Sequence, residues 1–593
     1  MKTKAAAICT IASILVAAAA IMPAAAADLE PYATIRLKSF DSIAEIGASL
    51  GALTEQPTVG MVVAMGAMGL KQGLGASFNS ARPIAAAISS SEPLPANLEN
   101  CEDFETVFEK IGESLVVAAA LPATEKQAKN FFAKKGAADW TDGVVEMESD
   151  FFATFKKGHL ILSNHEDGAG ALADKLLDSI APAIPGAQIE IAFHAPAVEF
   201  YKKFATSTGK NMRALTDPLG TFPQVSKIYE SHVKKSCELS TGILDQIESY
   251  AFAFSVSQEA GISFDDALAL KSGELLAALA KTPPLDPAKL AFIPDTAKAF
   301  AAASDLAAAC SYSYEIVDNL FGELAALIPD ADLKADVMTL LKQSIAVSKT
   351  ITATTAFADT DSNGRLVVAS KDHTSDPAAC ADYLTHAFAL WETVSEKYLD
   401  GAPWLTVNPK LPLWTLDFQE LFDFANKKAD EPIDKEIEEA AIKIIDAFFG
   451  KKFTGISIIM EKDVLTSRFM AEGSDYKFEQ NGTAANDKLA AFLAADKDAK
   501  PLVFAGVSLS AICADAYNKV PFPKAPDMPK ELELASGAPA PALIAVWMDK
   551  AMVRSRFNIP AAEIRNLAAF AAELSDDDED YDDDDDDDDD DDE

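Results

Sequence analysis

Histidine and cysteine are scarce in this chain of 593 residues, which contains six of each. Cys9 lies within the first 27 residues, in an apolar stretch typical of a signal peptide. The other five cysteines are widely spaced: Cys101, Cys237, Cys310, Cys380 and Cys513. An odd number leaves at least one thiol unpaired, and the spacings exclude a Cys-x-x-Cys metal knuckle. The alanine-rich sequence around Cys310 and Cys513 predicts small buried apolar residues.

Basic residues are also in deficit, since the formal net charge is −41. This charge argues against a nucleic acid as partner, because binding phosphates requires a basic face. Seventeen of the last 18 residues, Asp576 to Glu593, are acidic, and such a segment is expected to be disordered. Three roles stay open for this tail: gathering divalent cations, contacting a basic protein partner, or keeping the protein soluble.

Long apolar runs are absent after the N-terminus. The first 27 residues combine a basic MKTK start, an apolar stretch from Ala5 to Met22 and an Ala-x-Ala site at Ala25 to Ala27. This pattern predicts a signal peptide (residues 1–27) and an exported protein, periplasmic or at the cell surface. The run from Val59 to Leu70 is too short to span a bilayer, so no transmembrane segment is predicted after cleavage.

Catalytic motifs are missing as well. The sequence contains no G-x-S-x-G and no H-E-x-x-H, and Ser207 to Lys210 is an incomplete P-loop because Phe204 replaces its first glycine. No catalytic or cofactor-binding residue is therefore predicted. The sequence favours a non-enzymatic protein, and an enzyme whose site is assembled from distant segments remains an alternative.

What the sequence does contain is a repeat. Met548 to Phe557 (MDKAMVRSRF) matches Met460 to Phe469 (MEKDVLTSRF), and the letters LAAF follow both copies. The run ALIAVWM before the second copy predicts a strand buried on both faces, and Asp549-Lys550 predicts the turn of a hairpin. Equivalent hairpins should place Arg468 and Arg556 on one side of a sheet and bury Phe469 and Phe557. The two arginines are either an anion-binding pair or ordinary residues of a sheet face.

Looser copies of this pattern begin near residues 151, 250 and 351. The predicted fold is therefore α+β, with about five units of strand–helix plus hairpin–helix on antiparallel or mixed sheets. The units are expected at 28–185 (enlarged), 186–285, 286–400, 401–498 and 499–574 (short), followed by the acidic tail at 575–593.

These features together resemble a group of exported bacterial proteins of unknown function. The resemblance rests on the Pro-led strands, the hairpins followed by helices of small residues, the signal peptide, and the passages Pro57 to Leu74 and Ala81 to Ser89. It implies an α+β repeat protein of the cell envelope, and it carries over no catalytic residue.

One stretch has the oxygen pattern of a calcium loop. Asp359, Asp361 and Asn363 stand at positions 1, 3 and 5, Gly364 at position 6, and Ser370 where a bidentate Glu belongs. Because other copies of the repeat have their hairpin turn here, a plain turn is the main interpretation and a weak calcium site the alternative. The predicted role is a structural or binding protein of the envelope without a cofactor. The alternative is a protein that binds cations or another ligand through the tail or a cleft between units.

Overall fold

The computed structural model describes residues 29–58, 61–63, 65, 77–91, 114–135, 143–147, 151–178, 180–203, 234–235, 238, 241–305, 307, 311–399, 401–408, 413–428, 433–460, 463–478, 482–494, 496, 499–519 and 529–575. The predicted signal peptide, the acidic tail from Asp576, Cys101, Cys237 and Cys310 lie outside the described residues.

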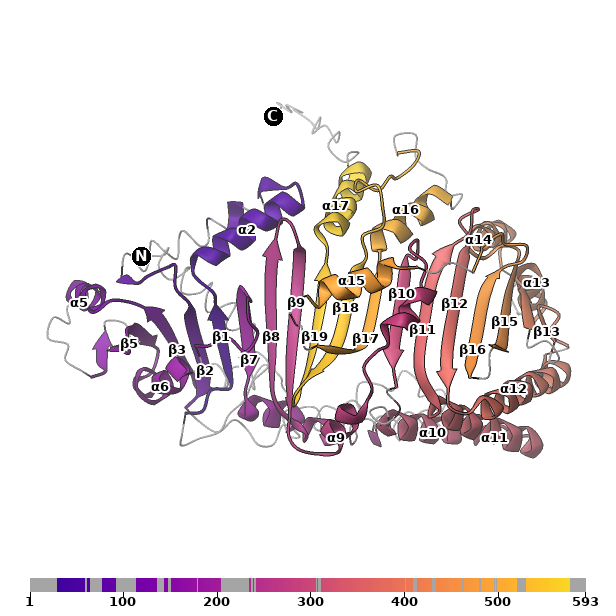
Figure 1. Ribbon diagram of the computed structural model, residues 1–593, viewed down its shortest axis with the longest axis horizontal. Coiled ribbons are helices and arrows are strands. Elements are labelled where there is room, and N and C mark those ends of the chain that lie inside the picture. Colours follow the sequence, from indigo (N-terminus) through magenta and orange to yellow (C-terminus); the bar gives the residue numbers. More distant parts are fainter. Residues whose placement is uncertain are drawn as a thin grey trace, which may run out of the picture.

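One antiparallel sheet runs through the whole described part of the chain (Figure 1). The strand pairings place its members in this order: β4 (Val145–Met147), β5 (Phe151–Lys156), β6 (His159–Ser163), β3 (Leu115–Pro122), β2 (Ile84–Ser90), β1 (Ala33–Leu37), β7 (Ile189–Phe193), β8 (Ile247–Ser257), β9 (Gly261–Leu270), β19 (Met552–Ile559), β18 (Ala542–Asp549), β17 (Lys500–Val507), β10 (Ala299–Ser304), β11 (Ile351–Thr360), β12 (Leu366–Thr374), β16 (Val464–Ala471), β15 (Lys452–Met460), β14 (Leu413–Asp417) and β13 (Leu405–Asn408). The α+β prediction is confirmed, and every pairing in this series is antiparallel.

Helices cover parts of both faces of the sheet. They are α2 (Asp41–Leu53), α5 (Glu125–Lys134), the π-helix η3 (Gly168–Leu172), α6 (Ala173–Asp178), α9 (Glu274–Lys281), the 3-10 helix η5 (Pro287–Phe292), α10 (Ser311–Ala325), α11 (Ala331–Ser348), α12 (Pro377–Tyr398), α13 (Phe418–Lys428), α14 (Lys435–Phe449), α15 (Ala484–Phe492), α16 (Leu509–Lys519) and α17 (Ala561–Ser575). None of the helices in the described part of the chain is long and apolar enough to cross a membrane.

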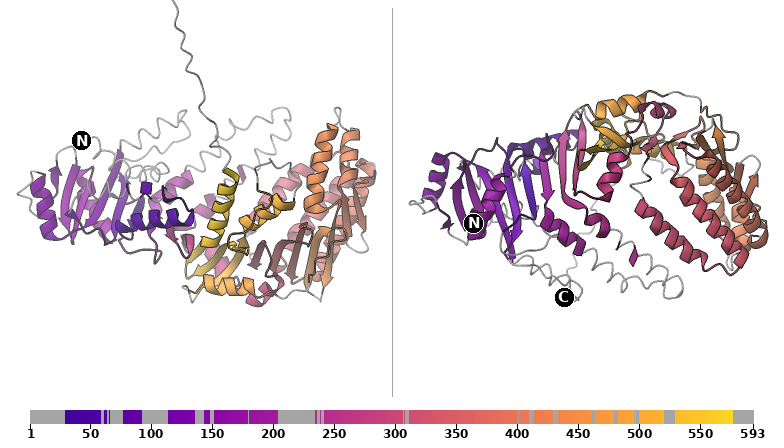
Figure 2. Two further views of the ribbon diagram at one scale, coloured as in Figure 1. Left: turned by 90° about the horizontal axis from the view of Figure 1, so that it is seen from above. Right: turned by 60° about the horizontal axis from the view of Figure 1, so that its bottom comes forward.

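The C-terminal strands occupy the middle of the sheet. In Figure 1 the yellow β18 and β19 stand between the magenta β9 and β10, although β9 and β10 follow each other in the sequence. β19 pairs with β9, and β17 pairs with β10. The N-terminal and C-terminal halves of the sheet are therefore joined through the last strands of the chain, and the sheet curves along its length (Figure 2).

The largest buried core lies on one face of the middle strands, which we call the α15 face. Leu489 of α15 and Leu290 of η5 pack there against Phe300, Phe504 and Trp547 of three adjacent strands. Side chains of a strand alternate between the two faces. The residues between these aromatic positions therefore point to the opposite face, which we call the α12 face.

The α12 face is covered at its two ends and open in between. One row of paired residues crosses ten strands on this face: Phe254, Phe264, Phe557, Ile544, Ala505, Ala301, Ala356, Ser370, Ser467 and Ser457. Phe254 packs near α2 at one end, and Ser457 faces α12 at the other. Between them Ile544 is 37% exposed although it lies on a central strand. The prediction that the strand ALIAVWM is buried on both faces is therefore wrong.

The two matched sequences are the second strands of hairpins, β16 and β19. Arg468 pairs with Ala369 and Arg556 with Ala545, both on the α15 face, as expected of equivalent residues. Phe469 and Phe557 are half-buried rather than buried, because the α12 face is partly open. The turn before β19 is Lys550-Ala551, one residue later than predicted, and Lys550 adopts a positive φ of 57°.

Candidate functional site

The predicted calcium loop is a turn between β11 and β12. Asp361 Oδ1 accepts hydrogen bonds from the backbone amides of Asn363 and Arg365, both at 2.9 Å, and Oδ2 accepts from the Ser474 hydroxyl at 3.0 Å. Gly364 has a φ of +80°, as this turn requires. Asp361 therefore acts as the acceptor that closes the turn, which is what Asp and Asn commonly do.

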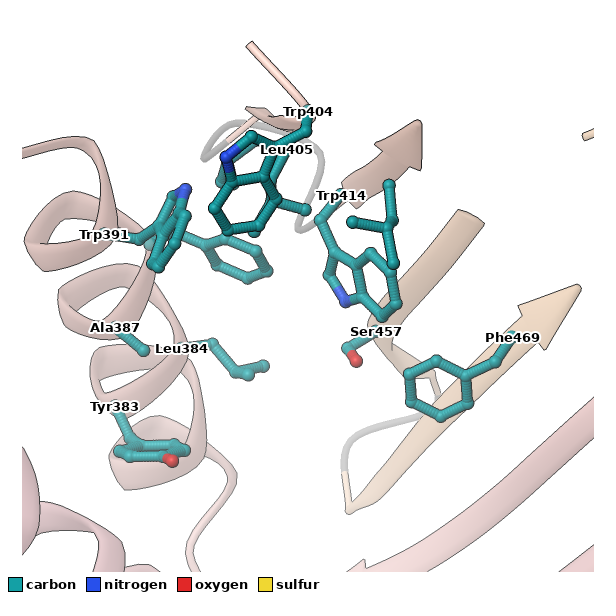
Figure 3. Close-up of a pocket in the computed structure, with 12 residues that line it drawn as sticks. Tyr383, Leu384, Ala387, Trp391, Trp404, Leu405, Trp414, Ser457 and Phe469 are labelled. Carbon is teal, nitrogen blue, oxygen red and sulfur yellow. The ribbon is translucent and has the colours of Figure 1, made fainter. Parts of the chain in front are cut away.

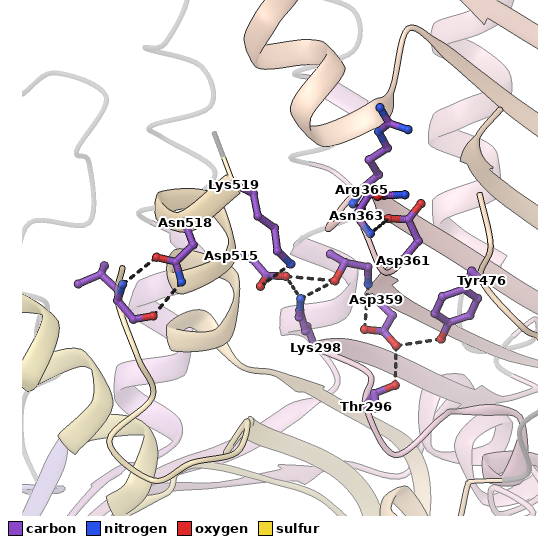
Figure 4. A network of polar contacts seen from close by, with 12 residues as sticks. Thr296, Lys298, Asp359, Asp361, Asn363, Arg365, Tyr476, Asp515, Asn518 and Lys519 are labelled. Carbon is purple, nitrogen blue, oxygen red and sulfur yellow. Dashed lines mark hydrogen bonds and ion pairs between the residues drawn. The ribbon is translucent and has the colours of Figure 1, made fainter. Parts of the chain in front are cut away.

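Asp359 is buried at the end of β11, just before this turn. Its Oδ2 accepts from the Thr296 hydroxyl at 2.6 Å and from the Tyr476 hydroxyl at 2.8 Å (Figure 4). Within the described ranges there is no group of three His, Cys, Asp or Glu side chains placed to hold a metal. A calcium ion at Asp359 and Asp361 would have to displace these donors, and calcium binding at this turn stays a prediction.

Two lysines share one carboxylate beside this turn (Figure 4). Lys298 of β10 forms an ion pair with Asp515 of α16 and donates to the Thr360 hydroxyl at 2.7 Å, and Lys519 lies 2.8 Å from the same carboxylate. Burial, with the positive charge of Lys519, lowers the pKa of Lys298 to about 8, while Asp359 opposes the shift. This cluster attaches α16 to the sheet.

The two arginines of the repeat do not form an anion site. Arg556 donates to Asp265 at 2.5 Å and lies 3.1 Å from Asp496. Arg468 lies over the ring of Phe478, with 4.6 Å between its guanidinium carbon and the ring centroid. Five strands separate β16 from β19, which puts the two side chains roughly 30 Å apart at the usual strand spacing. Sequence similarity marked equivalent positions in different units, and those positions are far apart.

The described residues enclose a pocket between α12 and the end of the sheet. Its volume is about 480 Å³, within the range of small-molecule sites. Its lining is mostly aromatic and aliphatic: Tyr383, Leu384, Ala387, Phe388, Trp391, Trp404, Leu405, Val407, Trp414, Leu416, Ser457 and Phe469 (Figure 3). Among the described residues, no acidic side chain, histidine, lysine or arginine belongs to this lining.

Helix geometry provides one wall of this aromatic pocket. The Asp376 side chain caps the start of α12 by accepting from the Ala379 amide at 3.0 Å, and Pro377 occupies the first helical position. The lining residues from Tyr383 to Trp391 recur at spacings of about four residues, which places them on one side of the helix. The helix therefore presents a continuous apolar stripe to the sheet.

Strand alternation provides the opposite wall. Val407 pairs with Trp414, Trp414 with Gly455, and Gly455 with Phe469, so these positions share the α12 face. A β-carbon on Gly455 would lie 2.3 Å from the Trp414 ring. Glycine at this position is thus what allows the indole to lie against the strand.

The aromatic rings form two groups. Trp391 and Trp404 meet edge to face with their centroids 5.8 Å apart, and Trp414 and Phe469 lie 5.9 Å apart. The indole nitrogens of Trp391 and Trp404 are buried and have no hydrogen-bond partner within the described residues. Ser457 is the one hydroxyl on the strand wall, and its oxygen lies 3.0 Å from that of Ser467.

Sequence reasoning missed this pocket, because its lining comes from several segments between residues 383 and 469. One signal was available, since three of the five tryptophans in the chain lie between residues 391 and 414. No protein-family model, no curated protein and no solved structure matches the chain. A functional assignment therefore depends on the geometry and chemistry of the pocket itself.

Proposed function

We propose that this protein is an exported, non-enzymatic binding protein of the cell envelope that holds an apolar ligand in the aromatic pocket. The observation that carries the proposal is the composition of the lining, in which three indoles, two phenylalanine rings and aliphatic side chains surround about 480 Å³. Contact between such walls and an apolar ligand removes apolar surface from water, and this stabilises the complex. The described lining has two hydroxyls, of Tyr383 and Ser457, but no histidine, lysine or carboxylate to activate them, which favours binding over catalysis.

We also infer that the scaffold is built from repeated units. Four sets of three adjacent antiparallel strands support this: β7–β8–β9, β10–β11–β12, β14–β15–β16 and β17–β18–β19. Neighbouring sets join by their first strands, as in β10 with β17, or by their last strands, as in β9 with β19 and β12 with β16. Each predicted unit contributes strands to the one sheet, and the boundaries between units stay predictions.

Export is supported by the sequence features of residues 1–27, and the acidic tail is proposed as a solubilising segment or a weak collector of cations. In this proposal the pocket is the specific site. Contacts of α12 with α11, β13 and β16 hold this helix against the end of the sheet.

The proposal is tested by filling the pocket. Ala387 lines it, whereas Ala389 is exposed two residues further along α12. We expect brominated dodecanol to quench the tryptophan fluorescence of the natural protein, because bromine quenches indoles that it touches and three of five tryptophans line the site. Ala387→Phe should raise the concentration of brominated dodecanol at half-maximal quenching at least about tenfold, because the added ring occupies space that the ligand needs.

Ala389→Phe is the matched control and should bind like the natural protein. Both variants should keep the circular dichroism spectrum of the natural protein. Equal binding by the two variants, or no saturable quenching of the natural protein, would show that the pocket is not a binding site.

A further inference from the structure

No lysine or arginine of the described residues lies over a ring of the aromatic pocket. Elsewhere the protein places its own cations over rings, as Arg556 does at 5.7 Å from Trp547 and Lys371 at 4.7 Å from Phe292. Within the described ranges no such pair involves a tryptophan of the pocket: the rings that carry a lysine or arginine are Tyr314, Phe292, Tyr398, Phe424, Phe478, Phe492 and Trp547. The negative faces of the pocket indoles therefore remain available to a cation from outside.

The polar groups of the pocket restrict which ligand charge it can hold. An anion needs a lysine, an arginine or convergent N–H donors, and neither basic residue is among the described residues that line the pocket. A primary ammonium brings three N–H donors that need acceptors. The described lining offers two hydroxyls, those of Tyr383 and Ser457, and its buried indole N–H groups are themselves donors. A fully methylated ammonium has no N–H to satisfy, so it can enter an aromatic site at the smallest desolvation cost.

Longer-range charges also favour a cation. The chain carries a formal net charge of −41, which attracts cations and repels anions at a distance. On the α12 face, Asp372 of β12 lies about 12 Å from Ser457 by strand spacing, and its carboxylate accepts from the Thr354 hydroxyl at 2.8 Å. Burial raises the pKa of Asp372, while the Thr354 hydrogen bond opposes the shift.

From these three observations we infer that the ligand of the aromatic pocket carries a quaternary ammonium group, such as the trimethylammonium head of a choline-type molecule. This inference rests on the proposed binding function and names the chemical class of its ligand. The rings of Trp391, Trp404 and Trp414 surround the methylated nitrogen, and the aliphatic lining contacts the attached chain. No covalent step is involved.

The test compares three probes by calorimetry at one ionic strength. They are choline, its uncharged isostere 3,3-dimethylbutan-1-ol, and ethanolamine, which lacks the three methyl groups. A cation–π contact that is removed from water stabilises the bound cation, and the uncharged isostere cannot form it. We therefore expect choline to bind at least about tenfold more tightly than the uncharged isostere. Ethanolamine should bind more weakly than choline, because its three ammonium N–H groups lose water and meet fewer acceptors, and because it lacks the methyl groups that contact the rings.

Trp414→Leu should weaken choline binding at least about tenfold in the same calorimetric measurement, because it removes one of the aromatic faces that would contact the cation. The control is Phe321→Leu, which removes a ring that is 40% exposed on α10 outside the pocket. It should change the affinity for neither choline nor brominated dodecanol. If choline and its isostere bind equally while brominated dodecanol binds, the cation inference is wrong and the pocket function stands. If none of the ligands binds, the proposed function itself fails.

Discussion

Lys298 shows how a single charge is tolerated inside the sheet. Its side chain is 15% exposed and shares Asp515 with Lys519. Burial lowers its pKa to about 8, because water no longer stabilises the charged form, whereas an unfolded lysine keeps a value near 10.5. Between these two pH values the unfolded chain binds more protons at this residue than the folded chain does.

This difference fixes the sign of a pH dependence. The contribution of Lys298 to stability should rise as the pH increases from about 8 to about 10.5, and should be lost again as the pH falls through 8. The shift corresponds to about 3 kcal/mol as an upper bound. Lys298→Met should remove this rise, measured as the urea midpoint at pH 8 and pH 10.

The control for this measurement is Lys435→Met, because the Lys435 side chain is 87% exposed on α14. It should keep the pH dependence of the natural protein. A Lys298→Met variant with an unchanged pH profile would mean that Lys298 stays charged throughout the folded state.

At the scale of elements, the hairpins could be predicted and their surroundings could not. The alternation of Val553, Ser555 and Phe557 is local, and it predicts a strand whatever lies beside it. The partner of that strand is β9, and Arg556 meets Asp265 across 291 positions of the sequence. No local pattern carries this information. For the same reason the apolar run of β18 could not show that Ile544, on the α12 face of the sheet, stays partly exposed to solvent.

The candidate site divides in the same way. The turn chemistry of Asp361 and Gly364 is local, and the sequence predicted a turn at these residues. The pocket depends on α12 lying over β13 to β16, and on Gly455 leaving room for the Trp414 ring. These contacts follow from the tertiary arrangement of the segments, so only their residue types could be read from the sequence.

Helix α10 offers an element-scale test. Gly322 lies inside this helix, and a β-carbon there would meet only the Met338 methyl group at 3.8 Å, an ordinary contact. Gly322→Ala should therefore raise the free energy of unfolding by about 0.5–1 kcal/mol, because alanine loses less backbone entropy in a helix. Urea unfolding measures this change.

Gly450→Ala is the opposite case, at the end of α14. Gly450 has a φ of +73°, and its β-carbon would lie 2.9 Å from that of Ala471. This variant should destabilise the protein, since alanine is strained at that φ. If Gly322→Ala also destabilised the protein, the packing of α10 against α11 would have to be closer than the structure shows.

At the scale of the whole molecule, the sheet of the described residues ends in short strands, and strands at its centre come from the last part of the sequence. β4 has three residues and β13 has four, and short edge strands limit pairing with other chains. The strands from residues 500 to 559 complete the interior of the sheet. The pairing of β19 with β9 cannot form until almost the whole chain is available.

Two truncations should therefore behave very differently. A chain that ends at residue 575 lacks only the acidic tail, keeps every strand of the described residues, and should unfold at the same urea midpoint as the full chain. A chain that ends at residue 498 lacks β17, β18 and β19, which leaves β9 and β10 with unpaired apolar edges in the middle of the molecule. We expect this shorter chain to aggregate, because exposed edge strands pair with other chains. Adding residues 499–575 as a separate fragment during refolding should restore a soluble 1:1 complex, which size-exclusion chromatography would detect. A soluble, cooperatively folded chain ending at residue 498 would contradict the central position of the C-terminal strands.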